Sequence, residues 1–258
     1  MKYPNLEKLV DIIAILRSEN GCPWDREQTH KTLRPNMLEE AYEAVDAIDD
    51  GDISNLREEL GDVLLQVVLH AQIAKDNNEF DIEDVAKELS DKLIHRHPHV
   101  FGNAHVDSAN DVVVNWDKLK QEEKIYRKSI LDGISKSQSA LMSAQKISKK
   151  VVKVGFEWQN VESLKECIQS EYKEFEEAVK SGNKEKMEDE MGDIFFATVN
   201  LARWYKIDAE QALLSANKKF TKRFQKMEEL KTKPFEDYTF EEFNDLWKKA
   251  KIEIEKEK

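Results

Sequence analysis

The chain has 258 residues, a formal net charge of -12 and 36% charged residues. This acidic balance excludes broad contact with nucleic acid, which needs a basic surface, and no apolar run approaches the length of about 18 residues that a membrane span requires. The 40% of hydrophobic residues suffice for a core, while only 8 glycines and 5 prolines favour helix almost throughout. We therefore predict an all-α protein with neither a nucleic-acid nor a membrane partner.

The cysteines and the first residues bear on the cellular compartment. Cys22 and Cys167 lie in different halves of the chain and form no CxxC motif, so neither a disulfide framework nor a zinc site is expected. Residues 1–19 alternate charged and apolar positions, which is not the pattern of a signal peptide. The predicted compartment is the cytoplasm.

In chain order, the first half shows the apolar periodicity of several amphipathic helices. A first stripe ends at Asn20-Gly21, and the next helix starts after Pro35. The turn signal Gly51-Asp52 separates this helix from one that runs from Ser54 to about Lys75. Further helices are predicted from Asp81, which is a suitable N-cap, and from Asp111.

The two helices around the turn carry four acids at fixed intervals. Glu40 and Glu43 are three residues apart, as are Glu59 and Asp62, so each pair lies on one side of its helix. Packed as an antiparallel hairpin, the two helices would bring the four carboxylates together. Such a cluster is repulsive unless a cation binds to it.

The same arrangement returns in the second half of the chain. The acids that repeat the 3-16-3 spacing are Glu171, Glu174, Glu190 and Asp193. Gly182 also falls where Gly51 does. One pair of acids a turn apart is most often a solvated helix face, but two complete quartets in one order do not follow from composition. We therefore predict two tandem helical domains, residues 1–128 and 141–258, joined by a polar linker over residues 129–140.

Four carboxylates without a histidine form a hard, all-oxygen site, which suits Mg²⁺ or Mn²⁺. In each copy, a Lys and an Arg four residues apart follow the acids and would bind phosphate oxygens, unless they form ordinary surface salt bridges. A Trp and a Lys four residues apart come last; the Trp either stacks on a nucleobase or anchors its helix in the core. The predicted substrate-binding residues are Lys186, Lys219, Arg223, Trp247 and Lys251 in the second copy, with Lys92, Arg96, Trp116 and Lys120 as first-copy equivalents of the last four.

Several segments, GCPWD, LEEAYE…LREELGDVLLQVV, RHPHVFG and GFEW…EDEMGDIFFATVNLAR, resemble the two-domain form of the MazG family of nucleoside triphosphate pyrophosphohydrolases. The resemblance implies Mg²⁺-dependent hydrolysis of nucleoside triphosphates to the monophosphate and pyrophosphate. It also implies a homodimer, in which helices of two chains complete a bundle around each site. Carried over by position, the implied metal ligands are Glu171, Glu174, Glu190 and Asp193, with Glu40, Glu43, Glu59 and Asp62 as their first-copy equivalents. The second copy departs from the family pattern at Ser170, where the first copy has Glu39.

The expected reaction is attack of a metal-activated water on the α-phosphorus, with pyrophosphate leaving. Either Glu174 or Glu190 would take the proton of the water, and tolerance for many bases is expected because stacking does not read base edges. Two alternatives stay open: a helical module that binds nucleotides or a partner protein without turnover, and a narrow, dUTPase-like pyrophosphatase. The second copy is expected to be the main centre, because Lys186 replaces Asn55 and Lys222 replaces His95.

Overall fold

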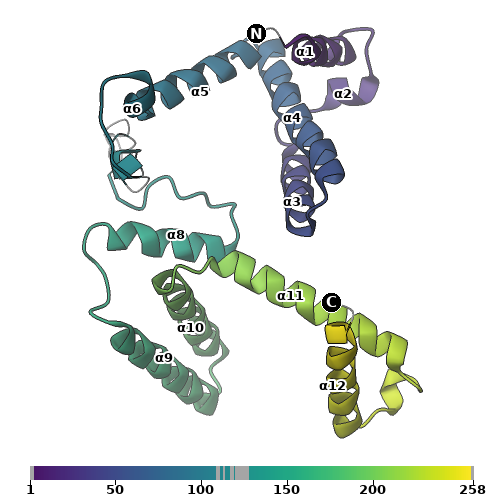
Figure 1. Ribbon diagram of the computed structural model, residues 1–258, viewed down its shortest axis with the longest axis vertical. Coiled ribbons are helices and arrows are strands. Elements are labelled where there is room, and N and C mark those ends of the chain that lie inside the picture. The colour runs from purple at the N-terminus through teal and green to yellow at the C-terminus, as the bar shows by residue number, and fades with distance from the viewer. Residues whose placement is uncertain (1–2, 109–110, 113, 117–118, 120–127, 257–258) are drawn as a thin grey trace. The chain divides into compact units, whose positions relative to one another are not determined.

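The computed structural model describes residues 3–108, 111–112, 114–116, 119 and 128–256, and within them it contains helices and no strands (Figure 1). The all-α prediction is confirmed. The chain divides into two compact units, residues 1–125 and 126–258. No helix of the described part is long and apolar enough to cross a membrane.

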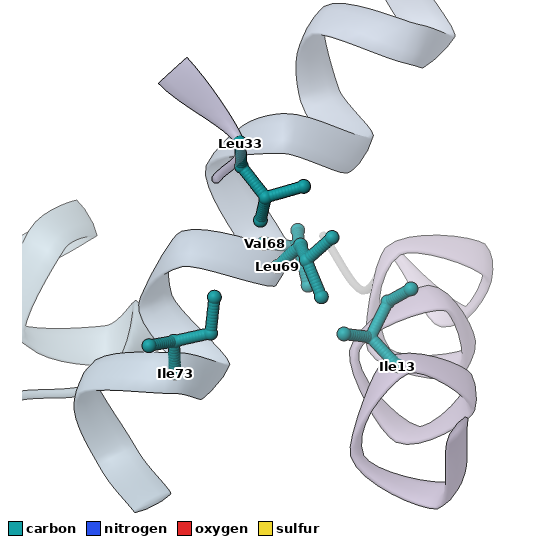
Figure 2. Packing of buried hydrophobic residues seen from close by; sticks show 5 residues of the cluster. All are labelled: Ile13, Leu33, Val68, Leu69 and Ile73. Atoms are coloured by element: carbon teal, nitrogen blue, oxygen red, sulfur yellow. The ribbon is translucent and has the colours of Figure 1, made fainter. Parts of the chain in front are cut away.

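The first unit is built around an antiparallel hairpin of α3 and α4, with α1 packed against α4. Its core is a small apolar cluster in which Ile13 of α1 meets side chains of α4 (Figure 2). Arg17, near the end of α1, adds an ion pair to Asp76 at 2.8 Å. The elements are α1 Pro4–Arg17, α2 Pro23–Glu27, α3 Arg34–Asp50, α4 Ile53–Asp76, α5 Ile82–Arg96 and α6 Pro98–Phe101. The core cluster is Ile13, Leu33, Val68, Leu69 and Ile73.

The second unit repeats the hairpin with α9 and α10, and α8 takes the place of α1. Here the contact includes polar groups: buried Ser148 donates to Asn200 Oδ1 at 2.5 Å. Gln145 donates to the carbonyl oxygen of Ile207 and accepts from the backbone N–H of Ala209, at the start of α11. The elements are α8 Ala140–Val152, α9 Val161–Ser181, α10 Lys184–Trp204, α11 Ala209–Leu230, η1 Phe235–Asp237 and α12 Phe240–Lys256.

The turns of the two hairpins have the same geometry. Gly51 and Gly182 end α3 and α9 with a φ of 69°, the left-handed conformation that favours glycine. The next residue caps the following helix with its side chain, Asp52 in the first unit and Asn183 in the second. The turn positions predicted from the sequence are therefore confirmed, and they fix which acids face each other.

A second hairpin, of α11 and α12, ends the chain. The two helices meet at the far half of α11 (Figure 1). There, Met227 packs with Leu246 and Ala250. Within the described residues, α12 contacts α11 and no other helix. The helix α12 is therefore packed apart from the acid-bearing hairpin, and among the described helices only α11 of this second hairpin contacts it, through α10.

The predicted linker, residues 129–140, contains turns and is bonded to α8. Lys150 donates to the carbonyl oxygens of Ile130 at 2.6 Å and Asp132 at 2.9 Å. Ser139 caps the start of α8. The domain boundaries themselves stay a prediction.

Candidate active site

In the first copy, the α3–α4 hairpin gathers three of the four predicted ligands. Carboxylate oxygens of Glu40 and Glu43, on α3, and of Glu59, on α4, all lie within 4.8 Å of one another. The i,i+3 spacing places the two glutamates of α3 on one side of that helix, and the antiparallel turn brings α4 against them. Glu40 and Glu59 are half-buried and Glu43 is exposed, so the cluster is open to solvent.

The second copy forms the same cluster. Oxygens of Glu171 and Glu174, on α9, and of Glu190, on α10, also lie within 4.8 Å of one another, with the same order of exposure. Three carboxylates at this separation form an all-oxygen donor set that fits a hard divalent cation such as Mg²⁺ or Mn²⁺. The assignment of these residues as metal ligands stays a prediction.

The fourth acid of each quartet stands outside the 4.8 Å group. Asp62 is nevertheless close enough to act on its neighbours: loss of hydration raises the pKa of Glu40 most, and the charge of Asp62 comes next. In the second copy, the charge of Asp193 is among the causes that raise the pKa of Glu190. The quartet is therefore three converging carboxylates and one more distant charge.

Loss of hydration and the crowding of the carboxylates raise the pKa values of Glu59 on α4 and of Glu190 on α10. Loss of hydration raises the pKa of Glu59 first, followed by the charge of Glu43 across the hairpin. The pKa of Glu190 is raised in the same way, with Glu174 as the largest charge. A bound cation would reverse the like-charge contribution, because it favours the ionised form of every carboxylate around it.

Two polar side chains next to the second cluster were not anticipated. Cys167 donates to Glu171 Oε1, with Sγ at 3.4 Å, and Ser170 donates to Glu174 Oε1 at 3.2 Å. Burial, followed by the bond to Glu171, raises the pKa of the Cys167 thiol to about 11, so the thiol is protonated and able to donate. The sequence signal for both contacts was their i,i+4 spacing from an acid.

The predicted Arg and Trp come together in both copies. The guanidinium carbon of Arg223 lies 5.6 Å from the ring centre of Trp247, and that of Arg96 lies 5.2 Å from Trp116. Phe220 also packs on Trp247, with ring centres 5.1 Å apart. A guanidinium that stacks through its face keeps its N–H edge available for phosphate oxygens.

Trp247 is half-buried and packs against the small core between α11 and α12, so the interpretation as a core anchor holds for one part of the ring. Its other predicted role, stacking on a base, requires the exposed part. Trp247 therefore makes a structural contact and is in part open to solvent.

Three of the predicted substrate-binding lysines lie exposed in the second copy. Lys186, Lys219 and Lys251 are exposed, and none forms an ion pair or side-chain hydrogen bond with another described residue. Lys92 of the first copy is also exposed, whereas Lys120 lies outside the described residues. Within the described part of one chain, no bond joins these lysines or Arg223 to the acid cluster.

Comparison with known proteins places both clusters in one domain family. The family model described as "MazG nucleotide pyrophosphohydrolase domain" matches residues 28–101 and 159–227, and the two segments begin at the same offset that separates Glu40 from Glu171. The prediction of two tandem copies is thereby confirmed. Each segment contains a full acid quartet, while Trp116 and Trp247 lie beyond the matched residues.

Relatives that match most of the chain are also found. The chain is 45% identical over 249 residues to "Nucleoside triphosphate pyrophosphohydrolase/pyrophosphatase MazG" of Thermotoga maritima, covering 95% of each chain. It is 44% identical over 233 residues to "Nucleoside triphosphate pyrophosphohydrolase" of Escherichia coli strain K12, covering 87% of this chain and 88% of that protein. A third relative, "Uncharacterized protein YabN" of Bacillus subtilis, is 45% identical over 96% of this chain and 52% of its own length.

Proposed function

This chain belongs to the MazG nucleotide pyrophosphohydrolase family, and we propose that it hydrolyses nucleoside triphosphates to the monophosphate and pyrophosphate in a Mg²⁺-dependent reaction. The observation that carries the proposal is the repeated cluster of three carboxylates within 4.8 Å, in a chain whose relatives are named for this activity. Bound Mg²⁺ would supply neutralisation of the triphosphate charge and activation of water.

The residues of the second copy would have three different roles in this reaction. Glu171, Glu174 and Glu190, with Asp193 nearby, would hold the cation. Lys219 and Arg223 would bind the phosphates and stabilise the charge that develops on the leaving pyrophosphate. Water forms a bond to the α-phosphorus, the bond from that phosphorus to the bridging oxygen breaks, and Glu174 or Glu190 accepts the proton of the water.

The nucleobase would lie against Trp247. Arg223 lies over the same ring. Because stacking does not depend on base edges, the site is expected to accept several bases, as ribo- and as deoxyribonucleotides. Lys251, one helical turn beyond Trp247, would add a positive charge at the same end of the ligand.

A homodimer would complete each site. In one chain, α12 contacts α11 alone among the described helices, so no direct packing joins the helix of Trp247 to the helices that carry the acids. Large apolar side chains are also exposed on the acid-bearing helices, with Phe195 59% and Tyr172 54% exposed. We expect a second chain to cover these apolar side chains and to place its Lys and Arg side chains near the acids. Light scattering at micromolar concentration should show a dimer; an active monomer would contradict it.

The second copy is proposed as the main catalytic centre. Its cluster has Lys186 one helical turn before Glu190, where the first copy has the neutral Asn55. An additional positive charge favours a triphosphate that carries about four negative charges.

One assay separates the proposal from its two alternatives. The protein is incubated with Mg²⁺ and a panel of ribo- and deoxyribonucleoside triphosphates, and the first product is identified. Pyrophosphate from several nucleotides is expected. Pyrophosphate from dUTP alone would indicate the narrow enzyme, orthophosphate would exclude attack at the α-phosphorus, and no product from any nucleotide would favour a binding module.

A further inference from the structure

Two side chains of α9 donate hydrogen bonds to the acids of the second copy. The Sγ of Cys167 lies 3.4 Å from Glu171 Oε1, and the Oγ of Ser170 lies 3.2 Å from Glu174 Oε1. Each donor precedes its acceptor by four residues, so the two pairs sit on adjacent turns of one helix. The helix α9 therefore presents a donor to each of its two clustered carboxylates.

The first copy has no such donors. Counted with the offset that relates Glu40 to Glu171, Asn36 stands for Cys167 and Glu39 for Ser170. Neither bonds Glu40 or Glu43 within the described part of the chain. The charge of Glu39 instead repels that of Glu40. The two clusters thus share their carboxylate spacing, yet only the second has hydrogen bonds of this kind among the described residues.

Such bonds matter for a cation site in two ways. A carboxylate held by a donor loses less side-chain freedom when the cation arrives. A donor also stabilises the negative charge of the crowded carboxylates before the cation binds. Residues that orient ligands from outside a metal site change metal affinity by roughly 10- to 100-fold, and an exposed hydroxyl belongs at the lower end of that range.

We propose that Ser170 and Cys167 are positioning residues that hold Glu174 and Glu171 for a divalent cation, and that they make the second copy the tighter cation site. The inference rests on the proposed function only in taking these acids as the metal ligands. It assigns a role to the serine that departs from the family pattern, since Ser170 supplies a donor where Glu39 supplies a charge.

The test measures Mn²⁺ binding without nucleotide, from the paramagnetic resonance signal of free Mn²⁺. The full-length chain carries Glu59→Gln, so that the second copy dominates binding. Ser170→Ala and Cys167→Ala should each weaken Mn²⁺ binding about tenfold. Ser170→Thr and Cys167→Ser, which keep a donor, should restore binding to within about twofold of the parent.

The matched control is Ser215→Ala, at another exposed helical serine, which should leave Mn²⁺ affinity unchanged. Alanine favours helix more than serine does, so Ser170→Ala should remain folded. Unchanged Mn²⁺ affinity in both alanine variants would overturn the inference, as would a threonine variant that binds as weakly as the alanine variant. A lower unfolding temperature with unchanged affinity would show a merely structural role and would overturn it too.

The outcome is independent of the proposed reaction. If the parent chain binds Mn²⁺ but releases no pyrophosphate from any nucleotide, the proposed function fails while the affinity comparison still decides the inference. If pyrophosphate is released and the alanine variants bind Mn²⁺ normally, the inference alone fails.

Discussion

Next to the acids of the first copy stand Glu39 and Asn55, and at the same two positions the second copy has Ser170 and Lys186. Around the second cluster, a negative charge is thus replaced by a hydrogen-bond donor and a neutral amide by a cation. The three clustered glutamates, by contrast, have the same spacing and order of exposure in both. Ligand geometry alone therefore does not distinguish the two copies, whereas the electrostatics of the surrounding residues does.

Removal of one ligand from each copy in turn should give the largest difference between the copies. Glu190→Gln should reduce pyrophosphate release on the order of 100-fold or more, because it removes a carboxylate that holds the cation. The matched Glu59→Gln should change it by less than about threefold. Release of pyrophosphate at saturating Mg²⁺ is the measurement. If Glu59→Gln has the large effect and Glu190→Gln the small one, the assignment of the copies is reversed.

The next effect concerns the cations. Lys219→Ala should raise the KM for the nucleotide about tenfold, because one charge-assisted bond to phosphate contributes roughly 1.5–3 kcal/mol. The exposed Lys92 is its matched control in the first copy, and Lys92→Ala should leave KM unchanged. Steady-state kinetics at fixed, saturating Mg²⁺ tests both. Equal increases in the two variants would show that both copies bind substrate.

A third effect should be alike in the two copies. The pKa values of Glu59 and Glu190 are raised in the folded chain, first by loss of hydration and then by like charges. Their ionised forms therefore destabilise the metal-free fold above those pKa values, and this penalty disappears as the pH falls below the unfolded value. Glu59→Gln and Glu190→Gln should each raise the thermal unfolding midpoint in EDTA at pH 7.5. A lower midpoint in either variant would contradict the electrostatic account.

The smallest effect should be confined to the first unit. The Nδ1 atoms of His30 and His70 are 2.7 Å apart, a hydrogen bond that requires one ring nitrogen without a proton. Burial, and then His30, lowers the pKa of His70. The stability from this pair is present above the unfolded histidine pKa of about 6.5 and is lost as the pH falls through the lowered value.

Thermal unfolding between pH 7.5 and 5 measures this loss. Wild type should lose stability toward pH 5, and His70→Leu, which introduces the residue of the second copy at Leu201, should lose less. The pair lies in the first unit, as do all six histidines of the chain, so the difference reports on that unit. The same pH dependence in both proteins would exclude the histidine pair as its source.

The acid-bearing helices, the turns between them and the acid pairs could be predicted from the sequence alone, because each depends on local backbone geometry. The helix predicted from Asp111 lies largely outside the described residues. Gly51 and Gly182 mark left-handed helix ends, and an i,i+3 spacing puts two acids on one side of any α-helix. The tandem duplication was equally accessible, since the constant offset between the two acid quartets can be read without a structure. The local bonds of Cys167 and Ser170 were accessible in principle, but their residue types do not identify donors until the side-chain rotamers are known.

Which side chains meet across helices depends on tertiary packing and could not be predicted from the sequence. Three glutamates converge in each copy, whereas Asp62 and Asp193, whose side chains are one methylene shorter, stand outside the group. The stacking of Arg223 on Trp247 and the pairing of His30 with His70 join residues that are distant in the sequence and lie on different elements. Helical periodicity gives the face on which a residue lies, but the packing of that face against another element gives its neighbour.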